Sequence, residues 1–168
     1  MSNIILGVGG GSSESSWNEI IDKPEIFDAM RIYGGTNLDA TGTTSDANAQ
    51  YPIISKSTAS AGAIFNKSIT DLPKGNYSVM VRMKVSAITS SSNIFKLVAT
   101  DGSVATTRYI KPNMFAANNT YATIGFNVEH TASTFSVALS VDAALAGQTV
   151  GVDYLAIAPA FTAVSAIG

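Results

Sequence analysis

The 168-residue chain contains no cysteine, only one histidine and only one tryptophan. The lack of cysteine excludes disulfide bridges and every metal site that depends on thiolate ligands. His130 lies in the stretch NVEHTAS at the end of a predicted strand and is expected to be an ordinary turn residue. No serine lies in a GxSxG motif, and no two acidic residues are placed as a glycosidase pair. We therefore expect a protein that is not an enzyme.

Charge is also scarce, because Asp, Glu, Lys and Arg make up 13% of the residues, about half the usual ~25%. The net charge is −2, which offers no broad basic surface for nucleic acid. The charge is unevenly distributed. Residues 1–50 carry seven acidic and two basic residues, and residues 51–168 carry five acidic and eight basic residues. An acidic N-terminal part can contact a basic partner or a neighbouring copy of the chain.

Long apolar runs are missing as well. No stretch approaches the ~20 apolar residues that a membrane-spanning helix needs. The start, MSNIILGVGGG, has no basic segment and an apolar run of only three residues. We expect neither a membrane segment nor a secretory signal peptide.

The dominant positive signal is alternation of apolar and polar residues, which is typical of half-buried β-strands. The run YSVMVRMKVSA, residues 77–87, places its apolar residues Tyr77, Val79, Val81, Met83 and Val85 on one face. Comparable runs span residues 93–100, 106–115, 121–130, 135–142 and 149–159, and weaker ones lie in residues 31–34, 52–55 and 61–68.

Turn residues such as PKGN, DGS and AANN separate these runs. In residues 149–159, strict alternation aligns Val150, Val152, Tyr154 and Ala156. No long helix is predicted beyond residue 30. The pattern predicts an all-β fold in which residues 31–168 form an antiparallel β-sandwich.

Two stretches resemble the jelly-roll domains of carbohydrate-binding modules. DLPKGNYSVMVRMKVS resembles their Gly-x-Tyr entry into an alternating strand with Arg, and GQTVGVDYLAIAP resembles their closing strand. The likeness covers about residues 60–160 and implies a jelly-roll sandwich. It also implies a structural calcium ion as a candidate cofactor, for which Asp153 is the candidate ligand. No other cofactor is expected.

The resemblance makes glycan binding a candidate function, with exposed aromatic rings stacking on sugars. The loop KPNMFAANNTY and the strand before it supply aromatic and amide side chains. The alternative is that these aromatic residues close the end of the hydrophobic core. The candidate glycan-binding residues are Tyr109, Asn113, Phe115, Asn118, Asn119 and Tyr121.

Residues 1–30 differ from the rest and are predicted to form an N-terminal attachment arm. GVGGGSS has the composition of a flexible linker and lacks the Lys-Ser/Thr of a phosphate loop. Trp17 buries a large apolar area with little entropy to lose, so it suits an anchor. The predicted contact residues of the arm are Ile4, Ile5, Leu6, Trp17, Ile20, Ile21, Pro24, Ile26 and Phe27. The alternative is that Trp17 packs on the sandwich of its own chain.

The segment WNEIIDKP, Trp17 to Pro24, resembles a short segment of fibre and fibre-attachment proteins of tailed bacteriophages. This resemblance implies a virion protein assembled in the host cytoplasm, such as a capsid decoration or head fibre. It also implies a capsid or other virion protein as partner and a homo-oligomer, with a trimer favoured. The alternatives are a tail fibre or baseplate component, an adhesin module for host or mucus glycans, and an accessory domain of a polysaccharide enzyme.

Overall fold

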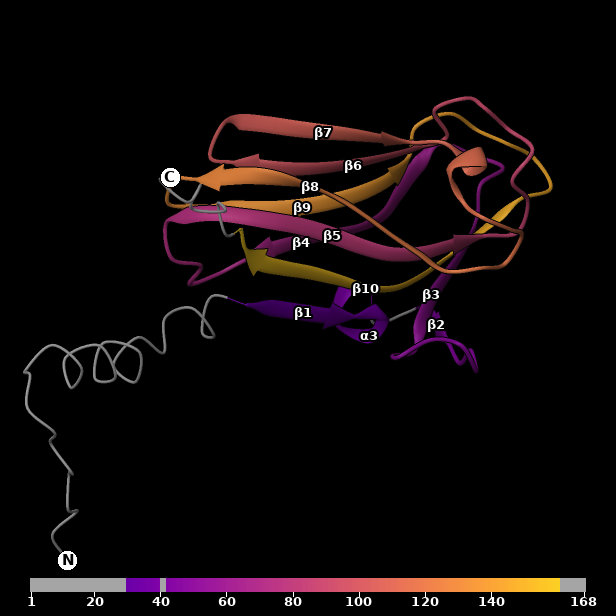
Figure 1. The fold of residues 1–168 in the computed structure, drawn as a ribbon, viewed down its shortest axis with the longest axis horizontal. Coiled ribbons are helices and arrows are strands. Elements are labelled where there is room, and N and C mark those ends of the chain that lie inside the picture. The colour runs from indigo at the N-terminus through magenta and orange to yellow at the C-terminus, as the bar shows by residue number, and fades with distance from the viewer. Residues whose placement is uncertain (1–29, 40–41, 161–168) are drawn as a thin grey trace, which may run out of the picture.

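A computed structural model describes residues 30–39 and 42–160 of the chain. All but the last residue of the predicted arm, and the end of the chain after residue 160, lie outside these described residues. Two antiparallel sheets pack face to face, which confirms the predicted β-sandwich (Figure 1). Within the described part, no helix combines the length and the apolar character needed to cross a membrane.

The larger sheet has six strands in the order β2–β3–β10–β5–β8, and β1 pairs with β10 beside β3. Every pairing in it is antiparallel. Its strands are β1 (Arg31–Gly34), β2 (Thr43–Thr44), β3 (Ile53–Ser57), β5 (Gly75–Val85), β8 (Ala122–His130) and β10 (Thr149–Pro159).

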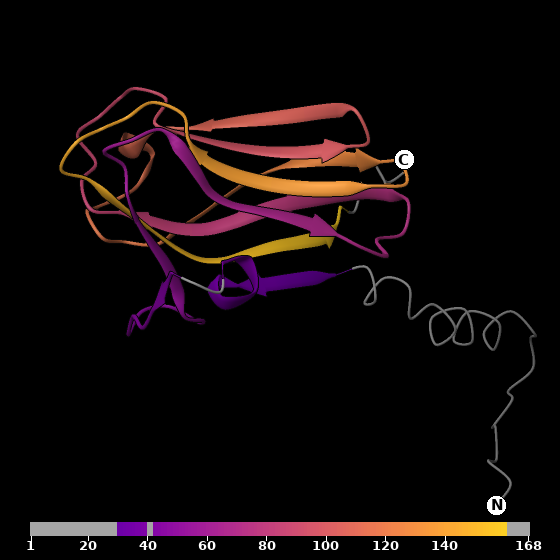
Figure 2. The same cartoon turned by 180° about the vertical axis from the view of Figure 1, so that it is seen from behind.

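The smaller sheet has four antiparallel strands in the order β4–β9–β6–β7. They are β4 (Gly62–Ile69), β6 (Phe95–Asp101), β7 (Val104–Ile110) and β9 (Phe135–Val141). β6 and β7 form a hairpin whose turn requires Gly102, because its φ of 59° is a left-handed conformation. The chain crosses repeatedly between the two sheets, as in a jelly roll, and Figure 2 shows the same fold from behind.

The core lies between the sheets and follows the predicted alternation along β5. Tyr77 is 3% exposed, and Val79, Val81, Met83 and Val85 are fully buried. The strand β9 shows the same pattern. Removing these apolar side chains from water is the main force that holds the two sheets together.

Strict alternation is wrong for the second half of β10. The register against β5 shifts between Val152 and Tyr154, which is the mark of a β-bulge at Asp153. After the bulge, Leu155 and Ile157 are fully buried in the core, whereas Tyr154 is half-buried and packs against Tyr51. The extra residue reverses which side chains face the core.

The predicted strand over residues 106–115 is also too long. β7 ends at Ile110, and Pro112–Met114 form a single 3₁₀ turn, η1. Proline has no N–H for a strand ladder and fits the first position of a helical turn. The turn sends Phe115 into the core.

A short helix, α3 (Gly35–Leu38), follows β1 and was not expected from the sequence. Gly35 makes it possible, because a Cβ at this position would lie 2.2 Å from the carbonyl oxygen of Pro52. Arg31 pairs with Ile157 near the end of β10, so both ends of the described chain leave the sandwich at the same end. The long loops lie at the other end (Figure 1).

Candidate functional site

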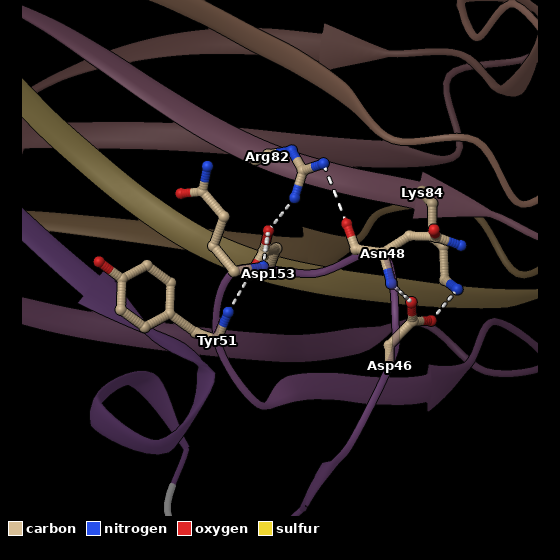
Figure 3. Close-up of polar contacts among 7 residues, drawn as sticks. Asp46, Asn48, Tyr51, Arg82, Lys84 and Asp153 are labelled. Carbon is tan, nitrogen blue, oxygen red and sulfur yellow. Dashed lines mark hydrogen bonds and ion pairs between the residues drawn. The ribbon is translucent and has the colours of Figure 1, made fainter.

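The loop of residues 45–52, here called the strap, joins β2 to β3 across the outer face of the larger sheet (Figure 3). At its end, the ring of Tyr51 meets that of Tyr154 edge to face, with the centroids 6.1 Å apart. A Cβ on Gly34 would lie 2.7 Å from the Tyr51 side chain, so glycine allows this close packing. The strap is thereby seated on β1 and β10.

Asp153 holds the strap from below. Its side chain is fully buried on the outer face of β10, beneath the strap. The backbone amides of Gln50 and Tyr51 donate to its carboxylate, at 3.0 and 2.9 Å. The guanidinium of Arg82, from β5, forms an ion pair with the same carboxylate. A buried carboxylate is stable only with such partners.

A second ion pair fastens the other part of the strap. Lys84 follows Arg82 by two residues, so both cations rise from the outer face of β5, and Lys84 pairs with Asp46. The hydrogen bond from Lys84, together with one from the Asn48 amide, holds the pKa of Asp46 below its usual value. Arg82 also donates to the carbonyl oxygen of Asn48, at 3.2 Å.

Tyr121 lies beneath both cations, just before β8. The Arg82 guanidinium lies 4.3 Å and the Lys84 ammonium 5.1 Å from its ring centroid, which are cation–π contacts. Burial, and after it the carboxylates of Asp46 and Asp153, raise the pKa of Tyr121 to about 12. The phenol is therefore neutral at physiological pH.

These groups border a cleft of about 400 Å³, here called the polar cleft. Asn119 and Tyr121, both candidates from the sequence, line this cleft. Asn48, Arg82 and Thr120, which were not predicted, complete the lining. The alternation of β5 already put Arg82 on the outer face, but only the fold shows that the strap and the β7–β8 loop meet there.

The other candidate glycan residues do not join this cleft. Tyr109 lies on β7 of the smaller sheet and is 45% exposed. Phe115 is only 3% exposed, so its ring offers no stacking surface and closes the core instead. Asn113 is exposed on η1, and the Asn118 side chain accepts a hydrogen bond from the amide of Ile88. The candidate glycan-binding residues thus do not form one continuous surface.

His130 lies at a strand end, as the sequence suggested, but it is buried and is not an ordinary turn residue. It is the last residue of β8, 4% exposed, and its Nδ1 lies 2.7 Å from the Asp101 carboxylate. Its Nε2 lies 3.1 Å from the carbonyl oxygen of Leu72. The amides of Thr131 and Ala132 donate to the same carboxylate. This cluster joins three turns at the end of the sandwich and has no serine or cysteine nucleophile among its contacts.

The surroundings of Asp153 do not fit the structural calcium ion implied by the sequence resemblance. Calcium takes six to eight oxygen ligands, whereas both Asp153 oxygens are engaged by amides and a guanidinium. Among residues 30–39 and 42–160, no group of three or more His, Cys, Asp or Glu residues could hold a metal ion.

No family model and no curated protein matches the chain. Several solved structures share its architecture. A family 35 carbohydrate binding module from Clostridium thermocellum aligns with a TM-score of 0.53 and 15% identity, over 78% of this chain and 98% of its own. The CBM36-1 domain of a multidomain xylanase from the hindgut metagenome of Trinervitermes trinervoides gives 0.52 and 14%, over 79% and 99%.

A CBM36 module in complex with calcium and xylotriose aligns with a TM-score of 0.50 and 13% identity, over 76% of this chain and 99% of its own. The fold is that of the carbohydrate-binding modules. The sandwich corresponds to nearly the whole of each of these three modules, and none of the three is described as catalytic. At these identities the likeness shows the fold alone.

The arm residues from Ile4 to Phe27 lie outside the described residues, and so does the Trp17–Pro24 segment that resembles phage fibre proteins. Met30 is described and is 45% exposed just before β1. The attachment function of the arm and the oligomeric state stay predictions.

Proposed function

We propose that this chain is a glycan-binding module that holds its sugar in the polar cleft. The observation that carries the proposal is the convergence of exposed amide and hydroxyl groups from Asn48, Asn119 and Thr120 around the Arg82–Tyr121 pair. Amides donate and accept hydrogen bonds, and a guanidinium donates several, so the cleft can match the dense hydroxyl groups of a sugar. The likeness to carbohydrate-binding modules supports the same function.

The geometry favours a glycan over a drug-like apolar ligand. The cleft is open and mostly polar. The aromatic ring that lines it, that of Tyr121, is already in contact with two cations. Such a surface gains affinity from several hydrogen bonds of modest net strength, about 0.5–1.5 kcal/mol each. We therefore expect weak monovalent binding, which neighbouring copies of the module strengthen by multivalency.

The test is binding of the full chain to a glycan array, followed by calorimetry on the best ligand. Asn48→Ala and Thr120→Ala should each weaken binding by about 2- to 10-fold, the equivalent of one lost hydrogen bond. Both side chains are exposed on loops, so the melting temperature should not change. Matched controls are Asn66→Ala on β4 and Thr107→Ala on β7, which are exposed on the smaller sheet.

Absence of binding to every glycan at millimolar concentration would refute the function. Binding that survives Asn48→Ala and Thr120→Ala but is lost on changing Tyr109 would refute the site and move it to the smaller sheet.

The virion interpretation is a separate proposal that rests on sequence alone. Its support is the Trp17–Pro24 segment and the acidic, linker-containing arm, and the similar solved structures add nothing to it. In this proposal residues 1–30 attach the module to a capsid or other virion protein, and the sandwich presents its cleft to host or mucus glycans. The two functions are compatible, since they use different parts of the chain.

A further inference from the structure

We infer that Arg82 positions the strap by taking the place of a bound cation, so that the fold and the polar cleft form without any divalent metal. This inference goes beyond glycan binding and does not depend on it. It assigns to one side chain the task of neutralising a buried carboxylate, of tying three segments together and of shaping the cleft wall.

The first support is the way in which Asp153 is satisfied. Its side chain has no exposed surface, while the paired Arg82 side chain keeps 22% of its surface exposed. One carboxylate oxygen accepts from the Tyr51 amide at 2.9 Å, and the other pairs with the guanidinium. The Gln50 amide donates to both oxygens. Each carboxylate oxygen therefore has two polar contacts within the protein.

The second support is the reach of the guanidinium. Its Nη1 group pairs with Asp153 on β10, and its Nη2 group donates to the carbonyl oxygen of Asn48 in the strap. The planar fork can make both bonds at once because its donors are fixed in direction. Figure 3 shows Arg82 between these two acceptors. Three segments distant in sequence are thereby linked by one side chain.

The third support is the charge balance of this face. Asp153 and Asp46 carry two negative charges, and Arg82 and Lys84 supply two positive charges in direct contact with them. A divalent cation brought to the same place would meet two cations at close range. It would also have to break ion pairs that are already formed. Side chains alone therefore balance the charges of this site.

The first experiment uses the unmodified full chain. Its melting temperature is measured in 10 mM CaCl₂, in 10 mM MgCl₂ and in EDTA, at matched ionic strength. We expect shifts of less than ~1 °C, because a protein without a site gains nothing from the ion. A calcium site with a dissociation constant near 0.1 mM would multiply the folding equilibrium constant roughly 100-fold. A rise of several degrees in calcium would therefore overturn the inference.

The second experiment tests Arg82 itself. Arg82→Met keeps the length of the side chain and removes the charge, so the melting temperature should fall by ~5 °C or more. Arg82→Lys restores the charge without the fork and should recover part of the loss. Lys84→Met is the matched control, because its partner Asp46 keeps 15% of its side-chain surface exposed. We expect a smaller fall for the control.

Amide hydrogen exchange distinguishes a local loosening of the strap from a loss of stability of the whole protein. The amides of Gln50 and Tyr51 donate to Asp153, so Arg82→Met should speed their exchange roughly tenfold more than that of β9 amides. Equal acceleration everywhere, or a Lys84→Met effect as large as that of Arg82→Met, would overturn the assignment. Glycan affinity is not a readout here, so this inference and the proposed function can fail independently.

Discussion

A buried carboxylate needs a partner for each oxygen, and Asp101 meets this need with a histidine where Asp153 uses an arginine. Asp101 is 8% exposed. Desolvation raises its pKa, but the hydrogen bonds from the Thr131 amide, from His130 and from the Thr131 hydroxyl outweigh it. The net result is a pKa for Asp101 well below the usual value of 3.8. The ionised form is therefore favoured in the folded state.

This pKa shift predicts a pH dependence of stability. A carboxyl whose folded pKa lies below its unfolded value stabilises the fold above the unfolded pKa, and this contribution is lost as pH falls toward the folded pKa. Asp101→Asn should therefore lower the free energy of unfolding at pH 7, and the gap to the wild type should narrow below about pH 4. Urea unfolding between pH 7 and pH 2 measures the gap. Parallel curves would show that ionisation of Asp101 plays no part.

At the scale of elements, the bulge in β10 decides how the last strand contributes to the protein. It lets Val152 and Leu155 both face the core although three positions separate them. It also places two consecutive residues, Asp153 and Tyr154, on the side of the strap. A regular strand could not serve the core and the strap in this way, because successive side chains would alternate strictly.

Because of the bulge, we expect Leu155→Ala to destabilise the protein more than Tyr154→Ser does. Strict alternation would predict the opposite order. Leu155→Ala removes a fully buried core side chain and should lower the free energy of unfolding by about 2–5 kcal/mol. Tyr154→Ser removes a half-buried ring from the outer face and should cost clearly less. Chemical denaturation of both variants gives the comparison. A larger loss for Tyr154→Ser would place the tyrosine, and not the leucine, inside.

At the scale of the whole molecule, the sandwich is complete within the described residues. The residues of its hydrophobic core extend in the sequence from Leu38 to Ile157, and the core lies between the two sheets. The arm and the module are therefore expected to be separable. β1 begins beside the end of β10, at the end of the sandwich opposite the long loops (Figure 1), so attachment through the arm would leave the loop end pointing away from the virion.

Removal of residues 1–29 tests this division of tasks. The truncated protein should keep its β-rich circular dichroism spectrum and a melting temperature within ~3 °C of the full chain, because no residue of the described core is lost. If the virion proposal holds, co-sedimentation with particles should be lost, and Trp17→Ala should reproduce that loss. Truncated protein that unfolds would mean that the arm packs on its own sandwich. Truncated protein that still attaches would contradict the arm's proposed function.

Local patterns were enough to predict most of the strands and the sandwich. Alternation in β5 and β9 identified both core faces correctly, because burial on one side of a strand imposes a period of two on its sequence. The Asp-Gly pair at residues 101–102 likewise predicted the turn between β6 and β7. These features depend on neighbours within a few residues.

The amino-acid sequence by itself determined the fold class and the absence of thiol chemistry. The tertiary structure alone decided that the strap covers Asp153, that Arg82 neutralises it and that His130 is buried beside Asp101. Residues in these clusters lie 29 to 103 positions apart in the chain. Contacts between distant residues leave no periodic mark in the sequence, because each is set by how the sheets and loops pack.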